Sequence, residues 1–220
     1  MPGIGTLNEK HLHKALKNLY ARPGDRKEVR VGRYVVDIFR DDELIEIQTR
    51  NFSSIKAKID KLTEKNNVRL VYPIAKEKYI LKPNCKKRRS PKTGRVEEVF
   101  KEMVYAPQLI KKGNFSLEVV LTKEEETRKM GKRRWRKAWV TEDRRLLEVM
   151  ETHLFKDPKD WQKLLPESLG ETFTTKDMAE AIGIRMYLIH KMAYCLKKAG
   201  LIELVGKQGR ANLYQITPSD

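Results

Sequence analysis

The stretch YVVDIFRDDELIEIQTRNF, residues 34–52, contains two short apolar runs around an acidic turn. The runs alternate apolar and polar residues as strands do, and two adjacent aspartates between them are typical of a turn. Two further acids, Asp37 and Glu46, stand inside the runs, where carboxylates are unfavourable. The stretch predicts a strand hairpin and raises the question of why it keeps acids inside its strands.

A turn at residues 41–42 would place Asp37 opposite Glu46 and Val35 opposite Gln48. Opposed residues share a face, with Cβ atoms roughly 4.5–5.5 Å apart, so the two like charges would repel. A divalent cation reverses that repulsion, and paired carboxylates completed by water and a phosphate suit Mg²⁺. The alternative is that both acids face solvent on an exposed sheet face. The opposite face would be apolar and would carry Val36, Ile38, Ile45 and Ile47.

Composition points to a polyanionic partner. The chain has 220 residues, 40% of them hydrophobic, and a net charge of +17 with a pI near 9.8. This balance favours nucleic acid first and an anionic membrane surface second. The chain has no apolar run of membrane-spanning length and no apolar signal segment at its start, so we expect no membrane association and a cytoplasmic location. Cys85 and Cys195 are too few for a disulfide framework or a Cys-based zinc site.

The first third of the chain predicts an α/β sheet sandwiched between helices. Residues 6–20 have helical spacing of leucines, and residues 27–49 contain three strand-like runs. A helix over 53–66, with Ser53 or Ser54 as N-cap, then precedes a nearly continuous apolar strand at 68–74.

The remaining segments define three predicted regions: a domain over 1–125, a basic linker over 126–140 and a second domain over 141–220. Strand-like runs surround the basic loop CKKRRSPKTGR, residues 85–95, which is either a solvated tip or a phosphate contact. Basic residues crowd around Trp135 and Trp139 in the linker. Beyond it, residues 141–155 and 158–169 have a helical pattern.

The order helix, hairpin with D-x8-E-x-Q, helix and buried strand resembles the PD-(D/E)XK nuclease superfamily over residues 6–74. The resemblance implies a restriction-endonuclease-like fold in which Asp37 and Glu46 bind Mg²⁺ or Mn²⁺. Gln48 takes the place of the usual Lys that positions the nucleophilic water; Gln is neutral, and Lys56 or Lys58 on the next helix is the candidate source of charge.

Members of this superfamily often carry another acid on the first helix, and Glu9 is the candidate for that metal ligand. The alternative is a capping box, in which Glu9 bonds back to the amide of Thr6.

Residues 172–216 resemble a winged helix-turn-helix, an α+β module. Thr174 and Asp177 form an N-cap signature for a short helix that ends at Gly183, and a second helix runs to about residue 198. Two strands flank the wing, residues 206–211. The side chains expected to contact DNA are Tyr187, His190, Lys191, Tyr194 and Lys198 on the second helix and Lys207 and Arg210 on the wing. The alternative is a protein–protein module.

Together these features predict a DNA-binding protein with a Mg²⁺-dependent endonuclease activity. The site residues would be Asp37, Glu46, Gln48 and Lys56, and the substrate would be duplex or branched DNA, with the chain acting alone or as a homodimer. The rival interpretation is a DNA-binding factor without enzymatic activity on a degenerate nuclease fold. An RNA-processing nuclease is a weaker third interpretation, which the absence of an RNA-specific aromatic platform leaves open.

Overall fold

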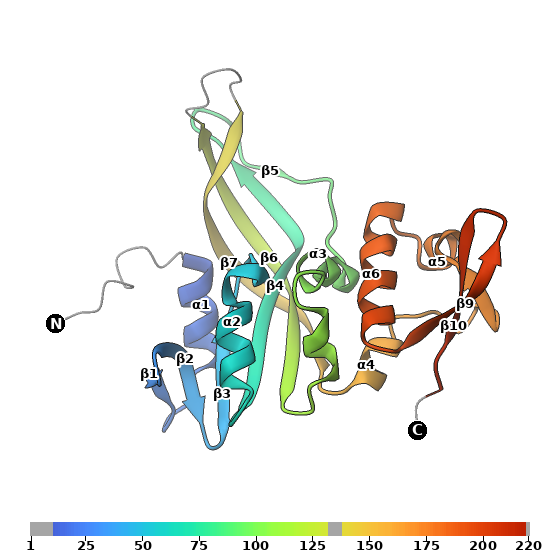
Figure 1. The fold of residues 1–220 in the computed structure, drawn as a ribbon. Coiled ribbons are helices and arrows are strands. Elements are labelled where there is room, and N and C mark those ends of the chain that lie inside the picture. Colours follow the sequence, from blue (N-terminus) through green and yellow to red (C-terminus); the bar gives the residue numbers. More distant parts are fainter. Residues whose placement is uncertain (1–10, 132–137, 219–220) are drawn as a thin grey trace. The chain divides into compact units, whose positions relative to one another are not determined.

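A helix followed by three antiparallel strands begins the fold, as the sequence predicts. The structure, a computed structural model, describes residues 11–131 and 138–218, so Glu9 and Trp135 lie outside the described residues. Helix α1 (His11–Tyr20) precedes β1 (Arg26–Val31), β2 (Tyr34–Arg40) and β3 (Glu43–Ile47). Figure 1 shows these elements in blue at the start of the described chain.

The hairpin of β2 and β3 has the predicted register. Ile38 pairs with Ile45, and Arg40 pairs with Glu43 across the turn, where Asp41 adopts a positive φ of 48°. The predicted apolar face is confirmed, because all four of its members are buried: Val36, Ile38, Ile45 and Ile47.

The sheet continues through longer strands than the sequence suggests. The next elements are α2 (Phe52–Leu62), β4 (Asn67–Leu81), β5 (Arg88–Arg89), η2 (Val96–Val99), α3 (Phe100–Met103), η3 (Pro107–Lys111), β6 (Phe115–Met130) and β7 (Trp139–Phe155). The strand order is β1-β2-β3-β4-β6-β7, with β5 added to β4. The fold is therefore mixed α/β with one large sheet (Figure 1).

The predicted helix over residues 141–155 is wrong, because this segment forms most of β7. Good helix formers fill it, but pairing with β6 overrides their propensity. Leu146 and Val149 pack against the core beneath α1, which supplies the burial that a solvated helix would lack. Most of the described part of the predicted linker over 126–140 is strand, since β6 runs to Met130 and β7 begins at Trp139.

Two smaller predictions are also corrected. The strand-like run EVFKEMVYA, residues 98–106, instead forms the end of η2 and the helical turn α3, with Phe100 and Met103 buried three residues apart. Asn51, not Ser53 or Ser54, is the N-cap of α2. The first free amide of that helix, on Phe52, donates to Glu102 Oε2 at 2.9 Å, so a carboxylate from another segment does the capping.

The core of the sheet lies under α1. Leu12 and Leu16 are buried against Ile38, Ile45 and Ile47 from the hairpin, together with Val71 of β4 and Val120 of β6. Leu19, which shares the helical spacing, is 58% exposed and does not join them. Helix α1 thus covers the apolar face of β2 and β3, and this fixes the position of the hairpin acids.

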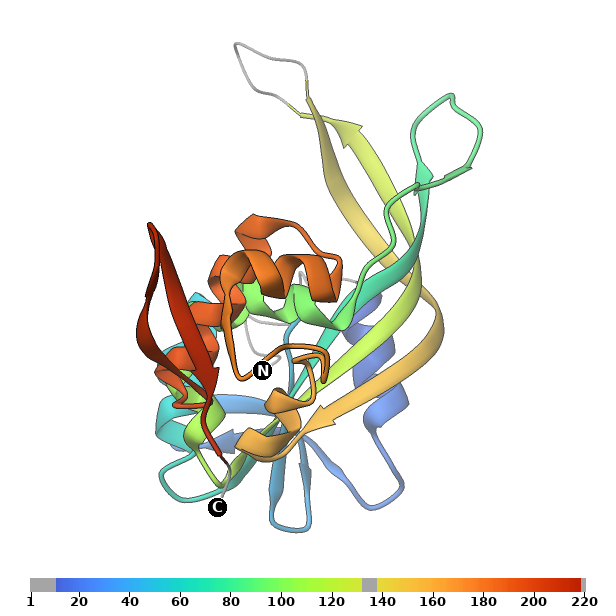
Figure 2. The same ribbon diagram turned by 90° about the vertical axis from the view of Figure 1, so that its right-hand side faces the viewer.

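The C-terminal elements form a short helix, a strand, two longer helices and a hairpin (Figure 2). They are α4 (Pro158–Gln162), β8 (Thr172–Thr174), α5 (Thr175–Ile182), α6 (Met186–Lys198), β9 (Ile202–Gln208) and β10 (Ala211–Ile216). The three strands pair in the order β8-β10-β9. The predicted N-cap signature is confirmed and takes the form of a capping box, since Thr174 and Asp177 exchange hydrogen bonds. The predicted end of α5 is confirmed at Gly183, with a φ of 71°. The longer helix expected over 158–169 shrinks to α4.

The described chain divides into two compact units, each built from separate segments. Unit 1 comprises the chain up to Thr49, Val71–Val96 and Val119–His153, whereas unit 2 comprises Arg50–Leu70, Glu97–Glu118 and the chain from Leu154 onward. Among the helices of residues 11–131 and 138–218, none has the length and apolar character needed to cross a membrane.

Replacing Gly94 by alanine should destabilise the protein. An added Cβ would clash with the carbonyl oxygen of Ala75, a backbone atom that cannot move without shifting β4. We expect a loss of roughly 1–3 kcal/mol in the free energy of unfolding, measured by urea denaturation. Gly113→Ala is the matched control, because no atom lies within 4 Å of its added Cβ. Equal stability of the two variants would contradict the close approach.

Candidate functional site

The first candidate site surrounds Asp37 on β2. Its Oδ2 accepts a hydrogen bond from the backbone N–H of Ile47 at 2.9 Å. The Nε2 atom of His13, from α1, lies 3.3 Å from the same oxygen. The side chains of His13 and Asp37 are 24% and 15% exposed, so both are partly accessible to solvent. Sequence reasoning did not identify His13, which α1 brings to Asp37.

Glu46 and Gln48 complete the predicted motif on the neighbouring strand. Continuing the observed register by one pair places Glu46 opposite Asp37. Glu46 is buried, with 7% of its surface exposed, which is unusual for a carboxylate that only faces solvent. The backbone N–H of Gln48 donates to the carbonyl of Val71 at 2.9 Å, which holds the end of β3 against β4. The alternative of two solvent-facing acids is therefore wrong for Glu46.

The other predicted members of this site are placed differently. Lys56 is exposed on α2, which belongs to unit 2, and its reach to the acids stays a prediction. Glu9 lies outside the described residues. Within residues 11–131 and 138–218, no group of three His, Cys, Asp or Glu side chains is arranged to hold a metal ion. Two opposed carboxylates are nonetheless an oxygen donor set that suits Mg²⁺ or Mn²⁺.

The second candidate site is the outer face of α6. Its inner face is buried through Leu188, Ile189, Met192, Ala193, Cys195 and Leu196. Tyr187 and Tyr194 are 50% and 45% exposed, and His190 and Lys198 are exposed beside them. The ammonium of Lys198 lies 6.0 Å from the ring centre of Tyr194. The predicted contact residues of the helix therefore share one solvent-facing surface, which is basic and aromatic.

Neighbouring helical turns of unit 2 border this surface on one side. Helix α6 packs against α3 and η3. The ammonium of half-buried Lys191 lies 5.8 Å from the ring centre of Tyr105. On the other side, Lys207 and Arg210 are exposed at the tip of the β9–β10 hairpin, where Gly209 has a φ of 60°.

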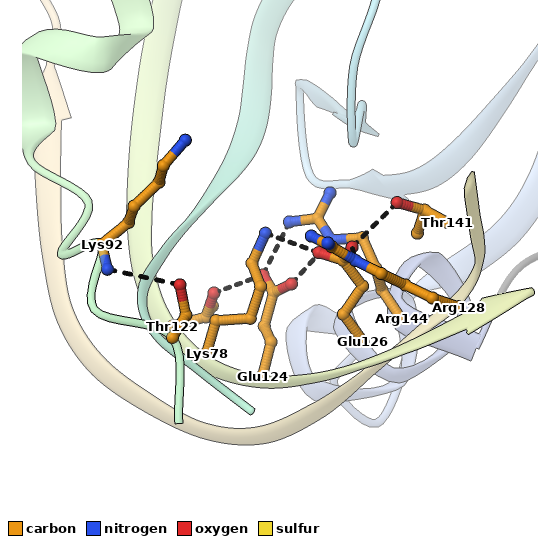
Figure 3. A network of polar contacts seen from close by, with 9 residues as sticks. Lys78, Lys92, Thr122, Glu124, Glu126, Arg128, Thr141 and Arg144 are labelled. Atoms are coloured by element: carbon orange, nitrogen blue, oxygen red, sulfur yellow. Dashed lines mark hydrogen bonds and ion pairs between the residues drawn. The ribbon is translucent and has the colours of Figure 1, made fainter. Parts of the chain in front are cut away.

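A third cluster, which sequence reasoning missed, is an ionic network inside unit 1 (Figure 3). Glu124 and Glu126 lie two residues apart on β6 and so share a face. Arg144 from β7 binds Glu124 through two nitrogens at 2.6 and 2.8 Å. The hydroxyl of Thr122 lies 2.6 Å from the same carboxylate. The Glu124 side chain is fully buried.

Glu126 has three donors of its own. Lys78 from β4 lies 2.7 Å from it, Arg128 lies 2.5 Å away, and the Thr141 hydroxyl donates at 3.0 Å. Burial alone would raise the pKa of Glu126, but the hydrogen bonds from Lys78 and Arg128 outweigh it and lower the pKa to about 2. Each carboxylate is neutralised by cations, so we interpret the cluster as a device for stability. The signal in the sequence was the E-x-E spacing directly after an apolar strand.

Comparisons with known proteins place the chain in a family. Residues 10–156 match the family described as a domain of unknown function, DUF8091, and the chain belongs to it. The match ends one residue after β7, so the family domain includes the whole large sheet. An uncharacterized protein of Treponema pallidum (strain Nichols) is 29% identical over 224 residues, which cover 98% of this chain and 88% of that protein. No solved structure matches the chain significantly.

Replacing Arg144 by methionine should strongly destabilise the protein, because it leaves the buried Glu124 without its cation. We expect a loss of roughly 3–5 kcal/mol in the free energy of unfolding, measured by urea denaturation. Arg145→Met is the matched control, since Arg145 is the exposed neighbour on the same strand. Pairing Arg144→Met with Glu124→Leu should recover part of the loss. If Arg144→Met unfolds like its control, the ion pair does not stabilise the sheet.

Proposed function

We propose that this protein is a metal-dependent endonuclease that binds DNA through its C-terminal helix α6. The observation that carries the proposal is the antiparallel pairing of β2 and β3, which sets Asp37 opposite Glu46. The elements α1, β1, β2, β3, α2 and β4 also follow in the order of the PD-(D/E)XK superfamily that the sequence resembles. The buried apolar face beneath α1 supports the same register.

The proposed chemistry is hydrolysis of a phosphodiester. Asp37 and Glu46 would hold Mg²⁺ or Mn²⁺, and such an ion, when bound, supplies a more acidic water and neutralises charge on the phosphate. Gln48, two residues beyond Glu46 along the chain, would orient the attacking water through its side-chain amide. Lys56 would supply the positive charge that a neutral Gln48 lacks. The main-chain N–H of Ile47 limits the rotation of the Asp37 carboxylate, which favours a constant ligand geometry.

We further propose that α5, α6 and the β8-β10-β9 sheet form a winged helix-turn-helix. The short turn at Gly183 between the two helices supports this, as does the exposed basic tip of the β9–β10 hairpin. In this arrangement α6 would enter the major groove of DNA with Tyr187, His190 and Tyr194 directed at the base edges. Lys207 and Arg210 would contact phosphates, which fix position but carry no sequence information.

A DNA-binding factor without enzymatic activity is the second candidate, and two observations favour it. Gln48 stands where the superfamily has a lysine, and Asp37 is already bonded to the Ile47 amide with His13 beside it. Both candidates share the α6 surface, so only a cleavage assay separates them.

Asp37→Asn and Glu46→Gln should each abolish Mg²⁺- or Mn²⁺-dependent cleavage of duplex and branched DNA, because each removes one charged oxygen ligand. Their DNA affinity should stay within about two-fold of the parent, since neither residue is on α6. Cleavage is followed on labelled substrates by gel electrophoresis, with single-stranded DNA and RNA for comparison.

Asp42→Asn, on the exposed turn of the same hairpin, is the matched control and should cut normally. Gln48→Lys should keep or raise activity, because it restores the residue usual in the superfamily. Retained cleavage in both acid variants would place the chemistry elsewhere, and a parent chain without cleavage would favour the DNA-binding factor.

Tyr194→Ala and His190→Ala should change which duplex sequences the protein prefers, whereas Arg210→Ala should weaken binding to all sequences by a similar factor. Selection from a random duplex pool measures the first effect, and electrophoretic shifts measure the second. These tests need the full chain, because a fragment starting near residue 140 would separate β7 from its partner strand β6 and would lack two segments of unit 2. Unchanged preference in both helix variants would show that α6 does not read bases.

A further inference from the structure

A second basic surface lies on unit 1, in the segment from Lys82 to Arg95, which we call the basic arm. It contains seven basic and no acidic side chains, far above the balance of the chain as a whole. From the sequence it could be a solvated tip or a phosphate contact. The arm follows β4 and includes β5, and Figure 2 shows it in green as an extended loop beyond the end of β4.

The arm is held in place along β4 by its backbone. Arg88 and Arg89 pair with Ile80 and Tyr79 as a short antiparallel ladder. Further along, the N–H of Ser90 donates to the carbonyl of Lys78 at 2.7 Å, and the N–H of Gly94 donates to the carbonyl of Lys76 at 3.2 Å. A loop whose basic side chains are only solvated would not need these backbone hydrogen bonds to β4. Fixed backbone positions lower the ordering cost of binding a ligand there.

Part of the arm's charge has no ionic partner among the described residues. Lys87 pairs with Glu125 at 2.6 Å, and Arg89 pairs with Glu77 at 2.8 Å. Lys86, Arg88 and Lys92 are exposed and form no ion pair with any residue of 11–131 or 138–218. Three cations therefore project from a pinned segment without internal neutralisation.

The aromatic rings near the arm carry lysines on their faces. The ammonium of Lys82 lies 4.4 Å from the ring centre of Trp139, and that of Lys87 lies 4.8 Å from the ring centre of Tyr79. A lysine ammonium therefore covers a face of each ring, and a nucleic-acid base cannot stack on that face. The arm is thus suited to phosphates and not to bases.

We propose that the basic arm is a second, sequence-independent contact to the phosphates of duplex DNA, separate from the α6 surface. This inference rests on the proposed function, which makes DNA the polyanion. A membrane surface fits less well, because residues 82–95 contain no aromatic or large aliphatic side chain to insert among lipids. Three phosphate contacts add affinity without sequence preference and add about 0.9 each to the slope of binding against salt.

The test uses the full chain with Lys86→Gln, Arg88→Gln and Lys92→Gln combined. Fluorescence anisotropy gives the binding constant for two unrelated duplexes over a range of NaCl concentrations. We expect the slope of log K against log salt to fall in magnitude by about 2–3, equally for both duplexes. Lys27→Gln, Lys65→Gln and Lys156→Gln, combined, form the matched control, because they remove the same charge from exposed positions elsewhere. Circular dichroism confirms that both triple variants are folded.

The basic arm is not a DNA contact if the arm variant has the same slope of log K against log salt as the parent chain, or if the control variant shows an equal fall in that slope. If Arg210→Ala still weakens binding in that case, the proposed function stands and only the arm fails. If the parent chain binds neither duplex at low salt, the proposed function itself fails. The last measurement is the binding of the parent chain and the arm variant to vesicles containing phosphatidylserine. If the arm variant loses vesicle binding but keeps its DNA binding, the basic arm contacts lipid and the inference is overturned.

Discussion

The large sheet depends on the positive charge placed against two buried carboxylates of β6. Burying an unpaired carboxylate costs several kcal/mol, so Glu124 and Glu126 require their cations wherever the strand is covered. Those cations come from three neighbouring strands, with Lys78 on β4, Arg128 on β6 and Arg144 on β7. The requirement links the strands through charge as well as through backbone hydrogen bonds. Arg144 adds a charge contact between β7 and β6 to the backbone pairing and apolar burial that keep β7 in the sheet.

The sequence predicted best where local pattern and tertiary burial agree. The hairpin register, the buried face of β2 and β3 and the capping box at Thr174 all follow from short-range rules, and the structure confirms them. Prediction failed for residues 141–155, because the burial of Leu146 and Val149 depends on partners far away in the sequence. The ionic network was missed for the same reason, since Lys78 and Arg144 are 66 positions apart in the numbering and meet only in the fold. For the candidate site, the sequence indicated Asp37 and Glu46 but not His13, which only the packing of α1 brings to Asp37.

The two acid pairs of the sheet have different surroundings, and this separates their roles. Around Glu124 and Glu126, Lys and Arg side chains neutralise both carboxylates. Asp37 instead accepts a main-chain N–H and has a half-buried imidazole beside it. The same residue types thus stabilise one part of the sheet and provide candidate chemistry in another. Burial and charge partners, not sequence spacing, distinguish them.

The discontinuous composition of the two units has a consequence for synthesis on the ribosome. Unit 1 needs residues 119–153 to complete its sheet, and unit 2 combines residues 50–70 and 97–118 with the chain beyond residue 153. A nascent chain that ends within β6 therefore contains neither unit in full. Contacts between segments so distant in sequence slow folding, because the loops between them must close first. Exposed strand edges would persist until translation is nearly complete, so the nascent protein is one that chaperones would need to protect until its last third emerges.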